Sequence, residues 1–367
     1  MNEDRAVRYH RLRRRSAIVS TLLCAAGLSA LLASGGAGRL AAWSAGFGGR
    51  AAAAGIVAAL LAGAWEIVSL PIAFHRNFLL DRKYGLSSET PRTWLGDHLK
   101  ALAIGLPLTA AAAAAVYGSM GTWPEWWWLV DTGLFAAVAV VFARFAPIVL
   151  MPLFYRFQPL ERDALRDRLL TVSTRAGIPV LGVFEWGLGE KTTRANAALV
   201  GMGRTRRIIV SDTLLKDYSD DEIEVILAHE LSHHVHHDLW SGLAVETLIV
   251  GASLVAANAA AVWLGPRFGV ARVSDVAGLP LLVLAGGAVS LLLRPLANAW
   301  SRHNERRADR FALELTERPA PFISAMRRLA VQNLAEERPS RPALWFFHTH
   351  PTIEERIAAA QDFSVKA

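Results

Sequence analysis

Residues 228–239 read AHELSHHVHHDL and hold five of the chain's eleven histidines. His229, Glu230 and His233 form the pattern His-Glu-x-x-His within this stretch. On a helix, positions i and i+4 lie about 40° apart, so the two imidazoles can share one metal ion while Glu230 reaches a water molecule on it. The acidic run at 220–222 suits the first turn of such a helix. The stretch therefore predicts a zinc-binding helix, and the alternative is a solvated polar helix that matches the pattern by chance.

The third metal ligand has to come from another part of the chain. His237 continues the helical stripe, but it lies roughly 12 Å along the axis from His229, too far for one zinc ion with bonds of about 2.1 Å to join both. A known longer pattern requires a histidine at position 239, which is Leu239 here. A second helix offers Glu305 as the favoured ligand, with His303 as its rival.

Asp309 lies one helical turn beyond Glu305. It could orient a ligating imidazole through the second ring nitrogen, or it could form an ordinary surface ion pair with a neighbouring arginine. The remaining histidines of the stretch, His234, His236 and His237, are expected to be solvated or interfacial. Three protein ligands leave an open coordination position, which is typical of catalytic rather than structural zinc sites.

One Zn²⁺ ion per chain, held in this way, lowers the pKa of its bound water toward about 7. Glu230 can then take a proton from that water and pass it to a leaving amine. The chemistry predicted from the pattern is amide hydrolysis.

The chain is too apolar for an ordinary soluble enzyme, since 53% of its 367 residues are hydrophobic. Its apolar residues form blocks long enough to span a bilayer. The first block could instead be a signal peptide, but it is long for one, and no small-x-small cleavage site is followed by a soluble chain. The fold class expected is mostly α: a polytopic helical membrane protein of about six transmembrane helices. The expected spans are 16–34, 51–74, 98–118, 126–150, 241–264 and 278–299.

The placement of lysine and arginine predicts the orientation in the membrane. Six arginines precede the first span and four basic residues lie in the loop 75–97, against four in the three loops on the other side. This bias places the N-terminus, the segment 151–240 and the C-terminal tail in the cytoplasm, so the zinc helix and Glu305 meet on one side next to the membrane. The net charge of +7 follows from the same bias, and no basic-aromatic pattern indicates nucleic-acid binding. The single cysteine, Cys24, gives no disulfide framework, which fits a cytoplasmic site.

The segment 151–240 reads as an α+β domain. A polar helix is expected at 161–176, and β-prone runs lie at 180–186, 196–200 and 207–211. The run 196–200, which begins with Asn196 and Ala197, is expected beside the zinc helix. It is either a plain structural strand or an exposed edge that pairs with an extended substrate backbone.

Several further stretches resemble the M48 peptidase family, and within it the integral-membrane, Ste24-like CAAX prenyl protease branch. The resemblance covers roughly residues 55–365. It is carried by LDRKYGL at 80–86, MPLFYRF at 151–157, TRANA at 193–197, RIIVSDTLL at 207–215, HELSH at 229–233, ERRAD at 305–309, and His350-Pro351 with Arg356.

The resemblance implies a zincin-type site with a defined set of residues. It implies zinc on His229, His233 and Glu305, with Glu230 as the base. It also implies that Asn196 and Ala197 hold the substrate backbone, and that His350 and Arg356 lie near the zinc. There a histidine could stabilise the developing oxyanion, and an arginine could bind a substrate carboxylate or brace the site. From the residues alone, His350 could equally be a histidine of the tail.

The chain also departs from the family pattern. Members of the resembled branch have an additional leading span that this chain is expected to lack, and Arg194 and His234 replace a histidine and an aromatic residue. The alanine- and arginine-rich composition resembles that of bacterial proteins, and bacteria generally lack prenylated CAAX proteins, so the substrate does not carry over. We expect a four-span membrane domain at 1–154 and a peptidase domain at 155–367 that contains two further spans.

Together these features predict an integral-membrane zinc metalloendopeptidase in the cell membrane, with its site facing the cytoplasm. Its expected partners are the lipid bilayer and a peptide or protein substrate that could be membrane-associated, with no nucleic acid and no particular oligomeric state. The alternatives are a quality-control protease of the broader family and a catalytically silent zinc-containing scaffold. Glu230 argues against the scaffold, because structural zinc needs no base.

Overall fold

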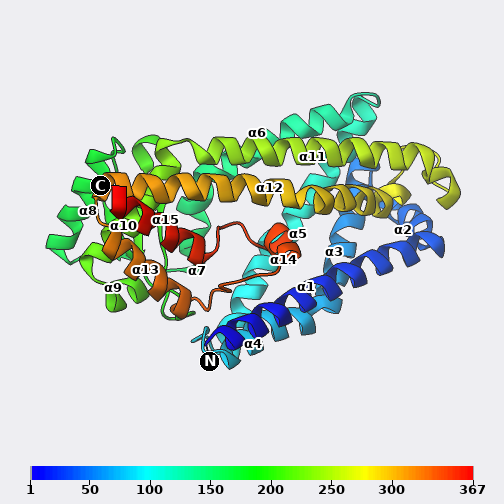
Figure 1. Cartoon of the computed structure of the whole chain (residues 1–367). Coiled ribbons are helices and arrows are strands. Elements are labelled where there is room, and N and C mark those ends of the chain that lie inside the picture. Colours follow the sequence, from blue (N-terminus) through cyan, green and yellow to red (C-terminus); the bar gives the residue numbers. More distant parts are fainter. Residues whose placement is uncertain (1, 367) are drawn as a thin grey trace.

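The computed structural model describes residues 2–366, most of which are helical (Figure 1). Among them, six helices are long and apolar enough to cross a membrane, which confirms the predicted number of spans. These six are α1 (Asn2–Ala33), α3 (Arg50–Phe74), α5 (Pro91–Thr122), α6 (Trp127–Val149), α11 (Asp238–Trp263) and α12 (Leu279–Thr316).

The spans expose most of their apolar surface. In α5 and α6, none of the most apolar 18-residue window is buried inside the protein. Large side chains such as Ile67, Leu248 and Leu292 are 72–78% exposed. A soluble protein rarely leaves so much apolar surface in water, whereas lipid tails solvate it. The protein is therefore a multi-pass membrane protein.

Helix α12 carries the chain from the membrane to the candidate site. It has 38 residues, which corresponds to about 57 Å of helix and exceeds the roughly 30 Å of a bilayer core. Its first half is apolar, and its second half holds the charged stretch around Glu305. The apolar block thus marked only part of the helix, because composition changes at the membrane surface while backbone hydrogen bonding continues.

Shorter helices connect the spans and build the domain at one end of the bundle. They are α2 (Gly36–Ser44), α4 (Leu80–Lys83), α7 (Met151–Phe154), α8 (Asp163–Arg175), α9 (Asp212–Asp217), α10 (Asp220–Val235), α13 (Pro319–Gln332), α14 (Arg341–Phe347) and α15 (Ile353–Lys366). A π-helical turn (His75–Leu79) joins α3 to α4, and 3₁₀ turns lie at Ala45–Phe47, Gly203–Thr205, Gly265–Phe268 and Val276–Gly278.

The two ends of the bundle differ. At one end, the connector around α2 packs with the turn before α12 through Leu40, Val273 and Val276. Helices α8, α9 and α10 lie at the opposite end, as Figure 1 shows. The glycine-rich connector and the candidate zinc helix are therefore on opposite sides of the spans, as the charge pattern requires.

A four-stranded sheet lies beside α10. Its order is β1 (Phe157–Pro159), β2 (Val183–Trp186), β4 (Arg207–Ser211) and β3 (Ala197–Val200). Strands β2 and β4 are parallel, and the outer pairs are antiparallel. The three predicted strands and the predicted polar helix, α8, are all present, whereas the short proline-containing β1 was missed. Strand β3 is an edge strand, with Ala197 paired to Val210.

Helix α10 is held rigidly at its start and along its length. Ser219 and Glu222 form a capping box, in which Ser219 N–H donates to Glu222 Oε2 at 2.8 Å. Leu227 and Leu231 are buried in the core that α10 shares with the sheet and with α13. The helix ends at Val235, and His237 adopts a left-handed backbone with φ 57° before α11 begins. The expectation that His237 continues the helical stripe was therefore wrong, because the chain turns there into the next span.

Candidate metal centre

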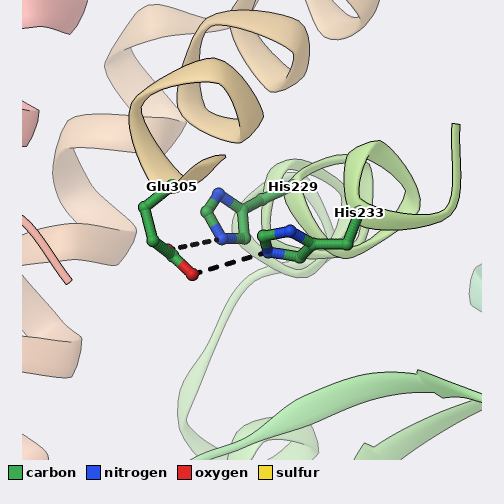
Figure 2. A group of neighbouring side chains, drawn as sticks. All are labelled: His229, His233 and Glu305. Carbon is green, nitrogen blue, oxygen red and sulfur yellow. Dashed lines mark ion pairs between the residues drawn. The ribbon is translucent and has the colours of Figure 1, made fainter. Parts of the chain in front are cut away.

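Helices α10 and α12 bring His229, His233 and Glu305 together. One ligand atom from each lies within 4.8 Å of the others. Figure 2 shows both imidazoles directed at the Glu305 carboxylate. His229 Nε2 lies 3.2 Å from Oε2, and His233 Nε2 lies 3.6 Å from Oε1. The rival, His303, is exposed and lies beside the Trp300 ring instead, so the geometry favours Glu305.

The second nitrogen of each imidazole is held by a carboxylate. His229 Nδ1 lies 2.9 Å from Asp309 Oδ1, and His233 Nδ1 lies 2.9 Å from Asp238 Oδ2. These bonds fix the orientation of both rings and leave both Nε2 atoms free for a shared ligand. Asp238 also pairs with Arg307. The sequence did not suggest Asp238, because its approach to His233 depends on the chain reversal at His237.

The cluster fits a zinc ion. Two imidazole nitrogens and a carboxylate are a donor set that catalytic zinc takes. Glu305 Oε2 is buried, and apart from the ion pair with His229 at 3.2 Å it has no hydrogen-bond partner among the described residues, so it is available to a cation. Burial lowers the pKa of His229, but the Asp309 and Glu305 carboxylates on its two nitrogens outweigh burial and raise the value to about 10. The site therefore attracts positive charge.

Glu230 lies beside this cluster with its carboxylate uncommitted. It is half-buried and forms no hydrogen bond or ion pair with any residue between 2 and 366. Burial raises its pKa, while His229 and His233 oppose the rise. A carboxylate with a raised pKa accepts a proton more readily than an exposed one, which suits a general base.

Arg356 of α15 braces the cluster from behind. Its Nε donates to Asp309 Oδ2 at 2.8 Å, and a terminal nitrogen donates to Asp309 Oδ1 at 2.5 Å. The same terminal nitrogen lies 3.4 Å from His229 Nδ1. The guanidinium is thus committed to Asp309, so of the two roles considered for it, the geometry favours bracing over binding of a substrate carboxylate. Asp309 lies in a buried network and not in a surface pair.

His350 reaches the cluster from the loop between α14 and α15. Its Nε2 lies 3.3 Å from Glu305 Oε1, its Nδ1 lies 2.9 Å from Thr349 Oγ1, and its side chain is 59% exposed. It therefore lies at the open face of the centre and is not a distant tail residue. Partial desolvation of the ring beside the cluster lowers its pKa.

The Asn196 side chain is exposed at the start of β3 and forms no hydrogen bond with another described residue, while Ala197 is buried and offers only its backbone. Further along the edge, His234 Nε2 contacts the Leu199 carbonyl oxygen at 3.0 Å. This contact gives His234 a structural place between α10 and the sheet. Arg194 lies away from the centre and pairs with Asp81 at 3.3 Å.

Two family models match the chain. The model for peptidase family M48 matches residues 159–364, and the model described as CAAX prenyl protease N-terminal, five membrane helices, matches residues 2–156. The described part of residues 2–156 contains four helices of spanning length, one fewer than that description gives.

Relatives and a solved structure agree with these matches. The chain is 29% identical over 299 residues to the uncharacterized metalloprotease YhfN of Bacillus subtilis (strain 168), covering 80% of this chain and 70% of that protein. It is 28% identical over 316 residues to a CAAX prenyl protease 1 homolog of Oryza sativa subsp. japonica, covering 84% and 74%. The crystal structure of S. mikatae Ste24p superposes with a TM-score of 0.84 at 20% identity, covering 98% of this chain and 89% of that chain, and so shares its fold.

Proposed function

Since the chain belongs to peptidase family M48, we propose that it hydrolyses peptide bonds with one zinc ion held by His229, His233 and Glu305. It is an integral-membrane metalloendopeptidase, and its substrate is a peptide or protein. The observation that carries the zinc assignment is the pair of carboxylates, from Asp309 and Asp238, that leave both imidazole Nε2 atoms facing Glu305.

Each residue of the centre has a distinct role in the proposed reaction. A bound zinc ion supplies Lewis acidity and lowers the pKa of a coordinated water. Glu230 takes a proton from the attacking water and delivers it to the leaving amine. His350 donates a hydrogen bond to the oxygen that gains negative charge. Asn196 and the backbone of Ala197 hold the substrate chain along the edge of β3.

The direct test of this proposal is hydrolysis of fluorogenic peptides by the purified protein in detergent. Treatment with 1,10-phenanthroline should abolish hydrolysis, and added zinc should restore it, since Asp309 and Asp238 keep both imidazoles oriented toward Glu305 without the metal. Hydrolysis that survives complete removal of metal would overturn the proposal. The quality-control and scaffold alternatives are not favoured, because the named relatives are CAAX prenyl proteases and a metalloprotease.

His350→Ala should lower kcat by about 10²–10³-fold while bound zinc and KM stay near the wild-type values, because an oxyanion donor acts mainly in the transition state. The side chain is more than half exposed, so its removal should not disturb folding. The measurement is steady-state kinetics on one peptide. His303→Ala on the same helical bundle is the matched control. Equal kinetics for the two variants would remove His350 from the reaction.

The orientation in the cell membrane is also part of the proposal. The excess of lysine and arginine on the side of α10 supports a cytoplasmic site, with a four-span membrane domain at 1–154 followed by a peptidase domain at 155–367. Gly46, which follows α2, and Ala271, in the turn before α12, are exposed, as is Lys216 of α9. Helices α2 and α9 lie at opposite ends of the bundle (Figure 1).

In intact cells, cysteines at Gly46 or Ala271 should react with an impermeant thiol reagent, whereas a cysteine at Lys216 should react only after permeabilisation. Cys24, the one native thiol, is first replaced by alanine. A cysteine at Gly46 meets no neighbouring atom within 4 Å, so the substitution should be tolerated. Labelling of the cysteine at position 216 in intact cells would contradict the proposed orientation, because it would place the metal centre outside the cell.

A further inference from the structure

A cavity of about 490 Å³ opens from the metal centre between α11 and α12. His233 and Glu305 line one end of it, so the cavity is continuous with the site where we place peptide hydrolysis. The other end is lined by Arg294 of α12 and Glu246 of α11. Both charged residues lie within candidate membrane spans.

Arg294 and Glu246 line the cavity without a partner among the described residues, unlike two acidic groups in other spans. Glu66 pairs with His98 at 3.3 Å, and Asp131 accepts a hydrogen bond from Ser119. Arg294 and Glu246 form neither a hydrogen bond nor an ion pair with any of residues 2–366, although both line the same cavity. A charge within a span is costly unless it faces water, a partner or a ligand. The cavity therefore holds an unused cation that the proposed reaction does not explain.

The helix geometry places Arg294 at a defined distance from the metal centre. It precedes Glu305 by eleven residues on α12, which is about three turns, so the two lie on nearly the same face about 16 Å apart along the axis. An extended chain advances about 3.4 Å per residue. In an extended substrate that runs from the metal centre into the cavity, the residue that reaches Arg294 therefore lies roughly five residues along the substrate from the scissile bond.

Glu246 lies at about the same depth on the facing helix. Two contacts show which positions of α11 and α12 lie side by side. Trp300 Nε1 donates to Ser241 Oγ at 3.3 Å, and Ser253 Oγ lies 2.9 Å from Ser290 Oγ. Glu246 on α11 and Arg294 on α12 both lie between these two contacts, but they do not form an ion pair. Glu246 thus adds a negative charge near Arg294 that would weaken the binding of a second carboxylate.

We propose, on the basis of the peptidase function above, that Arg294 is a specificity-determining residue that binds a carboxylate of the substrate. The carboxylate comes from an acidic side chain or from a free C-terminus, and it meets the exposed guanidinium in the cavity between α11 and α12 as a charge-assisted pair. Arg356 and Arg307, which contact the carboxylates behind the two imidazoles, are committed to Asp309 and Asp238 and do not serve this role. Glu246 limits the affinity from the opposite wall.

The test measures binding to protein that carries Glu230→Gln, so that no turnover occurs. Fluorescent neutral dodecapeptides are compared with versions that carry one aspartate at each position in turn, all as C-terminal amides. A second arm compares neutral peptides as free acids and as amides, which separates a terminal carboxylate from a side-chain carboxylate. In at least one arm, the carboxylate should tighten binding by about ten- to a hundredfold.

Paired variants separate recognition from a structural role. Arg294→Gln should abolish the preference for a carboxylate while binding of the neutral peptide persists, and Glu246→Gln should increase the preference. Arg294→Glu should favour peptides with lysine at the same position. Arg144→Gln, in α6 and outside the cavity, is the matched control and should change nothing. The proposal is overturned if wild-type binding shows no carboxylate preference, if Arg294→Gln retains it, or if Glu246→Gln reduces it. Failure of the Glu230-intact protein to cleave any peptide would instead count against the proposed reaction.

Discussion

Replacing Glu230 with glutamine is expected to reduce peptide hydrolysis by at least about 10²–10⁴-fold while one zinc ion per chain remains bound. The amide has nearly the same shape as the carboxylate but cannot accept a proton. Because Glu230 forms no hydrogen bond or ion pair with any described residue, its replacement leaves no broken contact behind. The two imidazoles and Glu305 keep their positions, since none of them depends on Glu230 for its orientation.

The measurement is kcat/KM on a fluorogenic peptide, together with zinc analysis of the same purified samples. Glu314→Gln is a matched control, because Glu314 is an exposed carboxylate that pairs with Arg310 on α12. The control should keep wild-type activity. Turnover by Glu230→Gln near that of the control would show that another group is the base.

Replacing Glu305 with alanine should lower bound zinc far below one ion per chain. Without Glu305, two imidazole nitrogens remain, and structural or catalytic zinc normally has at least three protein ligands. The substitution also removes the carboxylate that approaches both Nε2 atoms. His303→Ala, two residues earlier on the same helix, should keep its zinc, because His303 is exposed beside Trp300.

Metal analysis after dialysis against a chelator compares these two variants directly. Circular dichroism should remain that of a helical protein in both, since Glu305 packs against other polar groups of the centre and not in the apolar core. If His303→Ala loses the metal and Glu305→Ala retains it, then His303 and not Glu305 is the third ligand.

Much of the architecture follows from local composition. The six apolar blocks predicted the six spanning helices, because a bilayer demands about 20 apolar residues per helix whatever the tertiary packing. The blocks underestimated helix length: α12 continues to Thr316 as a polar helix, and α1 begins far before its apolar part. In the sheet, β4 matched the predicted run, whereas β1 has three residues, one of them proline, and carries almost no local signal.

Site residues that lie close together in the sequence could be predicted, whereas those that meet only through tertiary packing could not. His229, Glu230 and His233 could be identified because a helix brings them together within two turns. Asp238 could not, because its contact with His233 depends on the left-handed turn at His237. The commitment of Arg356 to Asp309 also depends on packing between α15 and α12, which no local pattern encodes.

The zinc assignment is tested most directly by X-ray diffraction from crystals of the Glu230→Gln protein, recorded above and below the zinc absorption edge. We expect one anomalous peak per chain, within bonding distance, about 2.1 Å, of Nε2 of His229, Nε2 of His233 and a carboxylate oxygen of Glu305. The absence of a peak among these three side chains in zinc-supplied crystals, or a peak bound instead to His234, His236, His237 or His303, would contradict it.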